Sequence, residues 1–531
     1  MYIYDRTCNV VAHCCLFANM KTIPMDATLL EILSVKGFFL ALVPLCLVGR
    51  IIYALAFDKL RHIPGPKVNA VSRLPYVRHL LRGTTVDNVV ALHRKYGSVV
   101  RISPNELSFT SGDTAWTDIY GLRTGKLKGH LNTQKDPIWY PAPVNGATSI
   151  LTDNDQAHSQ GRRLLSHAFS DKALHEQEPL IRNYVDQLVD RLKEVTSKDG
   201  QQTVDMTKWY NWTTFDVIAD LLFGEPFGCL QELKTHEHIK LLFDSVKLFS
   251  FLYITGYWPF LKRVQKFFVD RELLTKRHEY QTWISSQVTK RIERETDRSD
   301  FMSKILAHNG EKGTEMKKER LDTNANLILT AGSETTATLL SGATYLLLKN
   351  PDKLRLLQEE VRGRWKEYSD ITLAEVNNAP YLIATLQESL RYFPPVPTGF
   401  ERRIQKGGEF VSGVFVPEGT AVQVSQYPTN HSEENFKDAE KFVPERWLDD
   451  ERSAPYAEDK KAALQPFSFG PRNCLGKNLA LAEMRLIAAK LIWTFDLELD
   501  PSSEDWMDRC KVFTLWDKPE LAVKLTPVKR P

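Results

Sequence analysis

Apolar residues recur every three or four positions over long stretches of the chain, which is the spacing of a helix with a buried face. This periodicity predicts helices at residues 180–195, 213–223, 321–349, 352–365, 381–393 and 478–495. The alternation that is typical of strands is clearest in residues 409–425, where VSGVFV and TAVQV flank a turn at residues 417–419. We find no internal repeat and no second linker after Pro66. The pattern therefore predicts one mainly α domain with small β-sheets.

A continuous apolar segment near the N-terminus stands apart from these periodic stretches. Residues 37–57 are apolar except for Arg50, and this length of helix, at about 1.5 Å per residue, just spans a bilayer. A cleaved signal peptide would be followed by a small-residue cleavage site, whereas Lys59 and Arg61 follow here. A buried core helix is the other alternative, and we favour a single-pass transmembrane anchor. The basic residues after it predict that the C-terminal body faces the cytosol.

The anchor defines the expected organisation of the chain. Residues 1–36 form an N-terminal extension that matches no pattern we can interpret, and residues 37–57 form the anchor. Residues 58–66 contain two prolines around Gly65, which predicts a stiff hinge with one sharp change of direction. Residues 67–531 form the globular domain.

Composition excludes several functional classes. The chain has 69 basic and 66 acidic residues, and this near balance gives no sign of a nucleic-acid partner. Its seven cysteines are odd in number and scattered, which argues against a disulfide framework or a structural zinc site. The body is therefore expected to fold in a reducing compartment.

One cysteine has surroundings that suggest chemistry. Residues 467–476, FSFGPRNCLG, place Cys474 in a glycine-containing loop just before the predicted helix at 478–495. The helix dipole and backbone N–H donors would lower the pKa of this thiol, as a metal-bound thiolate requires. Gly470 and Gly476 let the backbone approach a flat cofactor, and Arg472 can pair with a carboxylate on it. A lone cysteine is more often a small buried apolar residue, but this spacing favours a ligand.

The same loop resembles the signature F-x-x-G-x-R-x-C-x-G of the cytochrome P-450 family at every defined position. The resemblance extends from about His62 to the C-terminus, because further motifs follow in the family's order. It implies haem b, with Cys474 as axial ligand of the iron, Phe467 packed near the sulfur and Arg472 on a propionate. It also implies the cytochrome P-450 fold, so residues 67–531 would form a haem-thiolate monooxygenase domain behind the transmembrane helix.

A second motif is the E-x-x-R pair of Glu388 and Arg391, which share one helical face. Such a pair is usually a solvated ion pair of little energetic value. Here residues 444–447, PERW, resemble the family's P-E-R-F segment, so that Arg446 can complete a buried triad. We expect the triad to be structural and to hold the cysteine loop in register.

A third motif, Ala331-Gly332-Ser333-Glu334-Thr335-Thr336, places small and polar residues in the middle of a long apolar helix. The hydroxyl groups could simply bond to carbonyls one turn earlier. The segment resembles the family's oxygen-activation motif, which implies a groove for dioxygen at Ala331 and Gly332. Thr335 and Glu334 would then be the catalytic residues that supply hydrogen bonds and relay protons.

Two further arginines are implied as propionate partners, Arg162 and Arg402. The family commonly has tryptophan where this chain has His158, which puts direct contact by His158 in doubt, and Arg163 competes with Arg162. An arginine on a helix surface is more often only solvated, but the other motifs favour ligation by Arg162.

Residues 214–230 and 166–170 resemble the fungal secondary-metabolite branch of the family, including trichothecene-type hydroxylases. By family position, the substrate pocket would be lined by residues 136–151, 327–331, 395–400 and 513–516. These segments are mainly apolar and aromatic, which suits a bulky lipophilic substrate, although they could equally be core. Residues 248–261 are also apolar, and Tyr253, Tyr257 and Trp258 suggest either a membrane-interface helix or an ordinary buried one.

The resemblance implies an enzyme that inserts one oxygen atom from O2 into a lipophilic small molecule, such as a terpenoid, polyketide or alkaloid intermediate. NADPH would supply electrons through a separate NADPH–cytochrome P-450 reductase, with cytochrome b5 as a second candidate donor, because no nucleotide fingerprint follows the cysteine loop. The expected location is the endoplasmic reticulum membrane, with the catalytic domain facing the cytosol. A reductase-independent isomerase or dehydratase and a non-catalytic haem sensor are the alternatives. The intact Glu334–Thr335 pair argues against the first, and the lipophilic pocket segments argue against the second.

Overall fold

The computed structural model describes residue 42 and residues 44–140, 145–197, 202–264, 271–294, 296–311 and 313–529. The chain forms two compact units, residues 1–61 and residues 62–531. In the first unit, residues 44–52 are helical and lead into the π-helix η2 (Tyr53–Phe57). Residues 37–41 and 43 of the predicted anchor, and the predicted extension at 1–36, lie outside the described residues. No helix in the described part of the chain combines the length and the apolar character needed to cross a bilayer.

The described part of the first unit has an exposed apolar surface. Eight large apolar side chains between residues 45 and 57 are each at least 40% exposed, namely Leu45, Leu47, Val48, Ile51, Ile52, Tyr53, Leu55 and Phe57, whereas Leu60 is buried. A surface with this many exposed apolar side chains is typical of a segment that contacts lipid or another protein.

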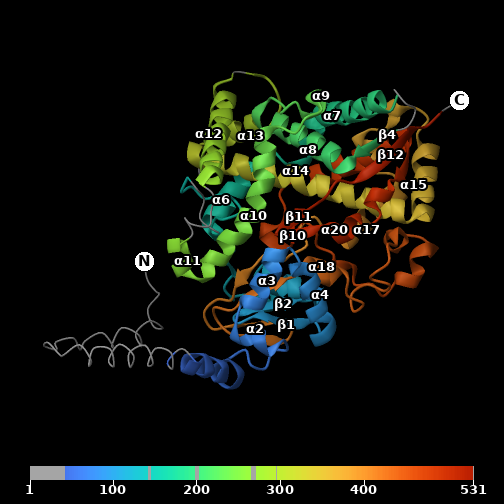
Figure 1. The fold of residues 1–531 in the computed structure, drawn as a ribbon. Coiled ribbons are helices and arrows are strands. Elements are labelled where there is room, and N and C mark those ends of the chain that lie inside the picture. The colour runs from blue at the N-terminus through green and yellow to red at the C-terminus, as the bar shows by residue number, and fades with distance from the viewer. Residues whose placement is uncertain are drawn as a thin grey trace, which may run out of the picture. The chain divides into compact units, whose positions relative to one another are not determined.

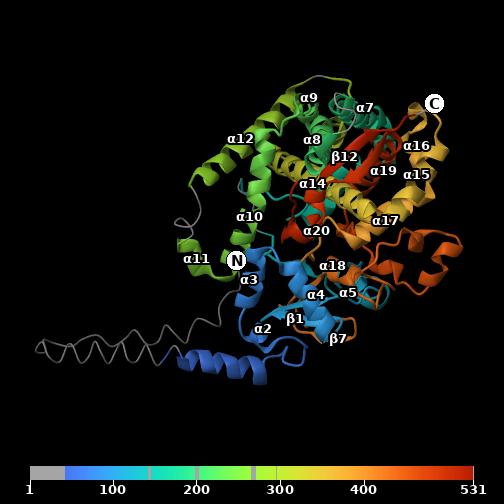
Figure 2. The same ribbon diagram turned by 45° about the vertical axis from the view of Figure 1, so that its right-hand side comes forward.

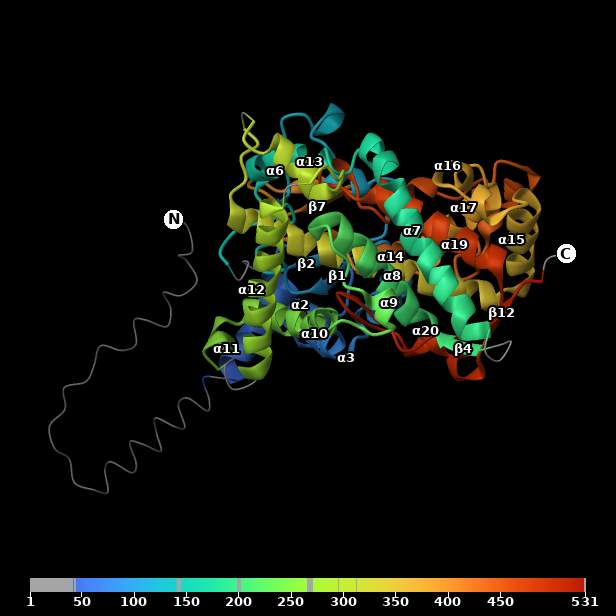
Figure 3. The same ribbon diagram turned by 90° about the horizontal axis from the view of Figure 1, so that it is seen from above.

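Helices dominate the second unit. The 32-residue helix α14 (Lys318–Lys349) runs through its middle, and α8 (Met206–Phe223) packs along it. In Figures 1 and 2, α7 (Asp171–Ser197), α8 and α9 (Cys229–Glu232) lie on one side of α14, and the N-terminal helices and strands lie on the other. Seen from above in Figure 3, α7 crosses the face that also contains α19 (Lys477–Thr494). The mainly α prediction is therefore confirmed.

Each predicted helix overlaps an observed one, and the predictions at 352–365, 381–393 and 478–495 run one residue past the observed ends. Asn350 is the N-cap residue of α15 (Pro351–Arg364), without a capping bond from its side chain, and Pro351 is at the first position, where the missing N–H costs no hydrogen bond. Helix α17 (Pro380–Tyr392) ends just before Pro394. The other helices of the unit in the described residues are α2 (Lys67–Val71), α3 (Leu74–Arg82), α4 (Thr85–Tyr96), α5 (Ala115–Tyr120), α6 (Asp155–Ser166), α10 (Glu237–Tyr257), α11 (Pro259–Val264), α12 (Arg271–Glu293), α13 (Phe301–His308), α16 (Leu373–Val376), α18 (Gln426–Asn430) and α20 (Trp506–Arg509), with short 3₁₀ turns η3 (Gly125–Leu127), η5 (Tyr368–Asp370), η6 (Pro444–Trp447), η7 (Glu451–Tyr456), η8 (Lys461–Ala463), η9 (Gly470–Arg472) and η10 (Pro501–Ser503).

A five-stranded sheet joins segments that are far apart in the sequence. Its order is β1 (Val99–Ser103), β2 (Glu106–Phe109), β8 (Ala421–Val424), β5 (Arg402–Arg403) and β3 (Gln134–Lys135). In this sheet Arg402 pairs with Val422 on one side and Lys135 on the other. The sheet thereby brings two basic side chains from distant parts of the chain to one place.

The remaining strands form small sheets. They are the three-stranded sheet β4 (Gln202–Asp205), β12 (Ala522–Pro527) and β9 (Phe495–Leu499), and the hairpins β6 (Glu409–Val411) with β7 (Val414–Val416) and β10 (Lys511–Phe513) with β11 (Leu515–Asp517). The predicted strand signal at 409–425 corresponds to β6, β7 and β8. VSGVFV is itself a hairpin, because Ser412 and Gly413 both have positive φ and turn the chain between β6 and β7.

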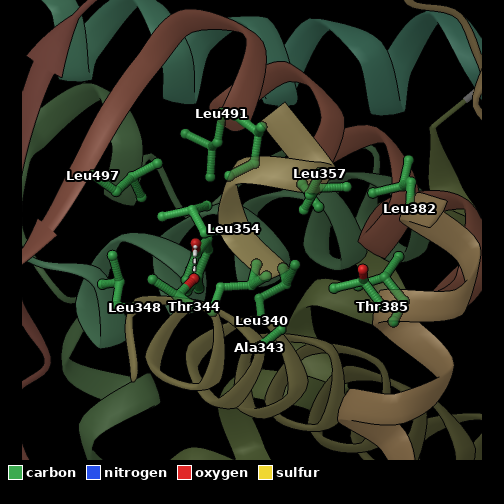
Figure 4. Close-up of a pocket in the computed structure, with 15 residues that line it drawn as sticks. Leu340, Ala343, Thr344, Leu348, Leu354, Leu357, Leu382, Thr385, Leu491 and Leu497 are labelled. Atoms are coloured by element: carbon green, nitrogen blue, oxygen red, sulfur yellow. Dashed lines mark hydrogen bonds between the residues drawn. The ribbon is translucent and has the colours of Figure 1, made fainter. Parts of the chain in front are cut away.

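Apolar side chains from α14, α15, α17 and α19 fill the core and leave one small cavity (Figure 4). Its volume is about 30 Å³, enough for one or two water molecules. Leucines line most of it, and the hydroxyl groups of Tyr210 and Thr344 hydrogen-bond to each other at 2.7 Å. This cavity is a packing feature of the core.

Candidate active site

The cysteine loop is a compact turn that ends where α19 begins. The N–H of Cys474 donates to the carbonyl of Phe467 at 2.8 Å, and that of Asn473 donates to Gly470 at 3.1 Å. Gly470 has φ +74°, and a Cβ atom there would lie 2.0 Å from the carbonyl oxygen of Tyr120. Only glycine fits this position. Gly476 is the N-cap of α19, so Cys474 lies just before the positive end of that helix.

The loop forms one wall of the large cavity of the second unit, whose volume is about 280 Å³. Most of the predicted site residues meet here although they are distant in the sequence. Those that line the cavity are Arg162, Ala331, Gly332, Thr335, Arg402, Phe467, Arg472, Cys474 and Gly476. Gly470 and Glu334 do not line it. Gly470 instead shapes the loop from behind.

The thiol of Cys474 is in an environment that differs from the expected one. Burial raises the pKa of this thiol above its usual value, and the N–H of Gly476 and the charges of Arg162 and Lys477 offset this only in part. The predicted lowering by the helix end and N–H donors is therefore present but is outweighed. Here desolvation of the thiolate outweighs both the backbone donor and the two nearby cations.

Basic side chains lie around the cavity, and some of their N–H groups have no acceptor among the described residues. Nε of Arg402 and Nη1 of Arg472 are buried and have no hydrogen-bond partner among the described residues. The other terminal nitrogen of Arg472 donates to the carbonyl of Asp153 at 3.0 Å and to the carboxylate of Asp155 at 2.7 Å. Unpaired buried guanidinium N–H groups are costly, so this arrangement suits a ligand that carries carboxylates.

Arg162 also reaches the cavity, whereas Arg163 does not. The guanidinium of Arg162 donates to the backbone carbonyl of Asn473 at 2.7 Å and also to its side chain, so it fixes the residue next to Cys474. Arg163 points elsewhere and donates to the carbonyl of Gly313 at 3.3 Å. His158 lines the cavity, and burial together with the charge of Arg472 lowers its pKa to about 3.

Sequence reasoning missed Lys135, which lies between the two arginines that have spare donors. It lines the cavity, its Nζ lies 4.9 Å from the ring centre of Tyr140, and it donates to the carbonyl of Leu151. Burial lowers its pKa to about 6, and the charges of Arg402 and Arg472 add to this effect. A single lysine in a two-residue strand gives no sequence signal. Only the pairing of β3 with β5 reveals it.

Helix α14 crosses the cavity without a break, since it is α-helical over all of Lys318–Lys349. The small and polar residues of the motif therefore do not break the helix. Ala331, Gly332 and Thr335 face the cavity, and the hydroxyl of Thr335 donates to the carbonyl of Ala331 at 2.8 Å. This bond is the back-bonding alternative, and the hydroxyl nevertheless lies on the cavity wall. Thr336 is fully buried.

Glu334 points away from the cavity, into a buried polar cluster. Its Oε1 forms an ion pair with Lys518 and accepts a hydrogen bond from Thr338 at 3.2 Å. No local pattern predicts Lys518 beside it, because the two residues are 184 positions apart.

The E-x-x-R residues form a fully buried cluster with Arg446. Nε and Nη2 of Arg391 donate to the carboxylate of Glu388 at 2.9 and 2.8 Å, and Arg446 adds a bond at 3.3 Å. The indole N–H of Trp447, in place of the family's phenylalanine, donates to the same carboxylate at 2.8 Å. Arg391 also donates to the backbone carbonyls of Asn430, Ala439 and Lys441. A charge cluster satisfied so completely is a rigid support rather than a reactive group.

The four segments expected to line the substrate pocket divide into two groups. Three of them contribute to the large cavity, through Tyr140, Ile150, Leu151, Leu327, Ile328, Ala331, Pro395, Val396 and Phe400, while residues 141–144 lie outside the described residues. Residues 513–516 do not line it. Trp516 is instead stacked on Phe393 at 4.3 Å, and its indole donates to the carbonyl of Pro394.

Three aromatic residues of the 248–261 segment, Tyr253, Tyr257 and Trp258, pack against an apolar cluster of the second unit, whereas Phe260 is 62% exposed. Tyr253 is 5% exposed and donates to the carboxylate of Glu401 at 2.6 Å. The guanidinium of Arg73 lies 3.5 Å from the ring centre of Tyr257, and Trp258 packs against the same apolar cluster. Tyr253 therefore fits the buried alternative, whereas Tyr257 and Trp258 are only half-buried, so the membrane-interface interpretation of this segment stays a prediction.

Comparisons with known proteins agree with this arrangement. The cytochrome P-450 family matches residues 64–524. The cytochrome P-450 monooxygenase traB of Penicillium crustosum is 56% identical over 503 residues, which cover 94% of this chain and 99% of that protein. Trichothecene C-15 hydroxylase of Fusarium sporotrichioides is 43% identical, covering 91% and 96%. Averantin hydroxylase of Dothistroma septosporum is 42% identical, covering 90% and 88%. The resemblance to fungal monooxygenases is confirmed, and this chain belongs to the cytochrome P-450 family of monooxygenases.

Proposed function

We propose that this chain is a haem-thiolate monooxygenase that inserts one atom of dioxygen into a lipophilic small molecule of fungal secondary metabolism. One observation carries the proposal. The thiol of Cys474, the hydroxyl of Thr335 and a ring of basic side chains, brought together from five separate segments, line the same cavity. Haem, when bound, supplies the reductive activation of dioxygen.

The residues present fit haem b. Cys474 would hold the haem iron through its sulfur, and Phe467 would pack near that sulfur. Arg472, Arg402 and Lys135 would bind the propionates, which would give partners to guanidinium N–H groups that have none among the described residues. Arg162 would contribute charge while it holds the backbone at Asn473. The Glu388–Arg391–Arg446 triad would hold the surrounding loops in register.

The protein's own contribution to the chemistry is proton supply on the α14 wall. The hydroxyl of Thr335 would exchange its bond to the carbonyl of Ala331 for one into the cavity and hold a proton there. Glu334, one residue before it, would return protons from solvent to that hydroxyl through water. General acid–base assistance of this kind typically contributes a factor of about 10² to 10⁴.

The substrate is proposed to be a terpenoid, polyketide or alkaloid intermediate. The cavity wall beyond the basic ring is apolar and aromatic, which favours a lipophilic molecule over a charged one. Two relatives are named for the hydroxylation of averantin and of trichothecenes. These names support a hydroxylation of the same general class.

Electrons are proposed to come from NADPH through a separate cytochrome P-450 reductase, with cytochrome b5 as a second candidate donor. The exposed apolar residues of the first unit and the apolar sequence of residues 37–57 support a single-pass anchor in the endoplasmic reticulum membrane. The catalytic unit would face the cytosol, as the basic residues after the anchor suggest.

Expression in yeast microsomes with a reductase tests the proposal. Reduced microsomes treated with carbon monoxide should show the long-wavelength Soret band of a thiolate-ligated haem. Incubation with a fungal metabolite extract and NADPH should then give a product heavier by one oxygen atom. Absence of the Soret band from folded protein would refute the haem-thiolate assignment. A normal band with NADPH-independent rearrangement would point to an isomerase instead.

A further inference from the structure

The polar cluster behind α14 joins the middle of that helix to the C-terminal end of the chain. Lys518 lies in the short connection between β11 and β12, and its Nζ contacts Oε1 of Glu334 and donates to the hydroxyl of Thr338 at 2.8 Å. Both charged side chains are nearly inaccessible, at 3% and 6% exposure. An ion pair so deeply buried costs desolvation energy, which its hydrogen bonds must offset.

The two oxygens of Glu334 are in different situations. Oε1 has two donors, Lys518 and Thr338, whereas Oε2 is buried and has no hydrogen-bond partner among the described residues. A buried carboxylate oxygen without a partner is costly and uncommon. The carboxylate is thus anchored at one atom and left with a free acceptor at the other, which is the arrangement that a proton relay through water needs.

The segment that carries Lys518 is itself held in place by hydrogen bonds. The carbonyl of Pro519, next to Lys518, accepts bonds from the indole of Trp506 at 3.0 Å and the hydroxyl of Thr207 at 3.2 Å. The backbone that carries Lys518 is therefore fixed to α20 and to the first turn of α8. A lysine has a long flexible side chain. Here the backbone at one end of it and Nζ at the other end are both held.

We propose that Lys518 is a positioning residue for proton delivery: with Thr338 it holds Oε1 of Glu334, so that Oε2 is the atom that carries protons toward Thr335. This inference rests on the proposed role of Glu334. It adds a residue from the C-terminal β11–β12 connection, outside every motif of the sequence, to the machinery of the reaction. Lys518 does not contact the cavity and would act only through Glu334.

The test uses the holoprotein with excess reductase, NADPH and dioxygen alone, so that no substrate needs to be known. Oxygen consumption per carbon monoxide-reactive haem is measured in H2O and in D2O. We expect Lys518→Met to lower this rate at least about tenfold and to raise the solvent isotope effect, because the relay loses its fixed acceptor. Lys518→Arg, which retains the charge, should recover most of the rate. Loss of the counter-ion can impair folding in Lys518→Met, so Lys518→Gln, which keeps a polar side chain, is measured in parallel. We expect a similar fall in its rate of oxygen consumption per haem.

Variants of Glu334 separate this inference from the proposed function. Glu334→Gln alone should be as slow as Lys518→Met, and adding Lys518→Met to it should change the rate less than twofold. A per-haem rate within twofold of wild type in Lys518→Met or Lys518→Gln would overturn the inference. So would an equal further fall in the Glu334→Gln background, because Lys518 would then act independently of Glu334. A wild-type rate in Glu334→Gln itself would instead overturn the proposed relay, and the role of Lys518 with it.

Discussion

Cys474 sits where two influences on a thiol oppose each other. Burial raises its pKa, while the N–H of Gly476 and the nearby cations lower it, and burial prevails. A thiol in this balance is a poor nucleophile by itself, but a metal ion would deprotonate it outright. Cys474 can therefore serve as a thiolate ligand once a metal ion is bound.

Replacement of Cys474 tests whether its sulfur is the ligand of the haem iron. We expect Cys474→Ser to lose the long-wavelength Soret band of the reduced carbon monoxide complex and to lose turnover. Among the described cysteines only Cys474 lines the cavity, since Cys229 and Cys510 are buried elsewhere in the core and Cys46 belongs to the first unit. The measurement is the carbon monoxide difference spectrum beside the NADPH-dependent product. A variant that keeps both would show that Cys474 is not the ligand.

Replacement of Gly470 is expected to act through a steric clash alone. Its positive φ and the approach of the Tyr120 carbonyl mean that Gly470→Ala must displace the backbone of the cysteine loop. We expect this variant to fold with at least about tenfold less bound haem, measured as carbon monoxide-reactive haem per protein. Gly363→Ala in α15, where a Cβ atom meets nothing within 4 Å, is the matched control and should bind haem normally. Normal haem content in Gly470→Ala would contradict the geometry.

Thr335 gives the mechanistic prediction at this scale. Thr335→Ala removes a hydroxyl from the cavity wall and raises helix propensity, so folding should survive. Proton delivery should fail, so that dioxygen reduced by electrons from NADPH is released as hydrogen peroxide. The product formed per NADPH should fall by about tenfold or more. Thr336→Ala is the control, because Thr336 is buried and does not line the cavity. Equal coupling in Thr335→Ala and wild type would leave Thr335 as an ordinary helix back-bonder.

Residues within continuous motifs were predictable, and residues that depend on long-range pairing were not. Cys474 and Thr335 lie in segments whose local spacing already carries the chemistry. Lys135 and Lys518 are isolated lysines, and each gains its role from a segment more than a hundred positions away. The conformation of Thr335 and the balance at Cys474 also needed the structure, because both depend on which neighbours surround the group.

At the scale of elements, helices follow local periodicity and strands do not. Helix α14 was predicted within a few residues because its apolar spacing repeats along 32 residues. The five-stranded sheet was not predicted, because β3 and β5 have two residues each and β8 pairs with β2 from more than 300 positions away. Strands so short have no alternation to detect, and only tertiary packing defines them.

His93 ties α4 to this sheet and predicts a pH dependence of stability. Its ring bonds to the carbonyl of Gly97 at 2.8 Å and to the hydroxyl of Ser108 in β2 at 2.7 Å. Burial lowers the pKa of His93 from its usual 6.5 to about 4. The unfolded chain therefore takes up the proton first as the pH falls. Stability from the neutral ring is complete above about pH 6.5 and is lost progressively toward pH 4.

We expect the midpoint of thermal unfolding to fall less between pH 7 and pH 4.5 in His93→Gln than in wild type, even if the variant is less stable at pH 7. His175→Gln is the control, because His175 is exposed on α7. Differential scanning fluorimetry of the holoprotein across this range makes the measurement. Parallel curves for His93→Gln and wild type would show that His93 does not contribute.

At the scale of the whole molecule, the two compact units differ in where their apolar side chains lie. The second unit buries Tyr253 and most of its large apolar side chains, whereas the described residues of the first expose nearly every large apolar side chain. Sequence alone could not separate these cases, since residues 248–261 and residues 37–57 are both apolar and both contain aromatic rings. The difference depends on partners such as Glu401 and Arg73, which come from distant segments.

This difference predicts where membrane affinity resides. We expect residues 62–531, expressed alone, to keep the carbon monoxide spectrum, because they form a compact unit with their own core. Their binding to phosphatidylcholine liposomes should fall at least about tenfold relative to the full chain, since the exposed apolar segment is removed and each buried CH₂ contributes about 0.8 kcal/mol to membrane partitioning. Flotation of both proteins with liposomes measures this. Full-length protein with Leu47→Asp and Ile51→Asp, two exposed positions of that segment, is the matched control and should lose binding without truncation. Equal flotation of the truncated and full-length proteins would place a membrane-binding surface on the second unit.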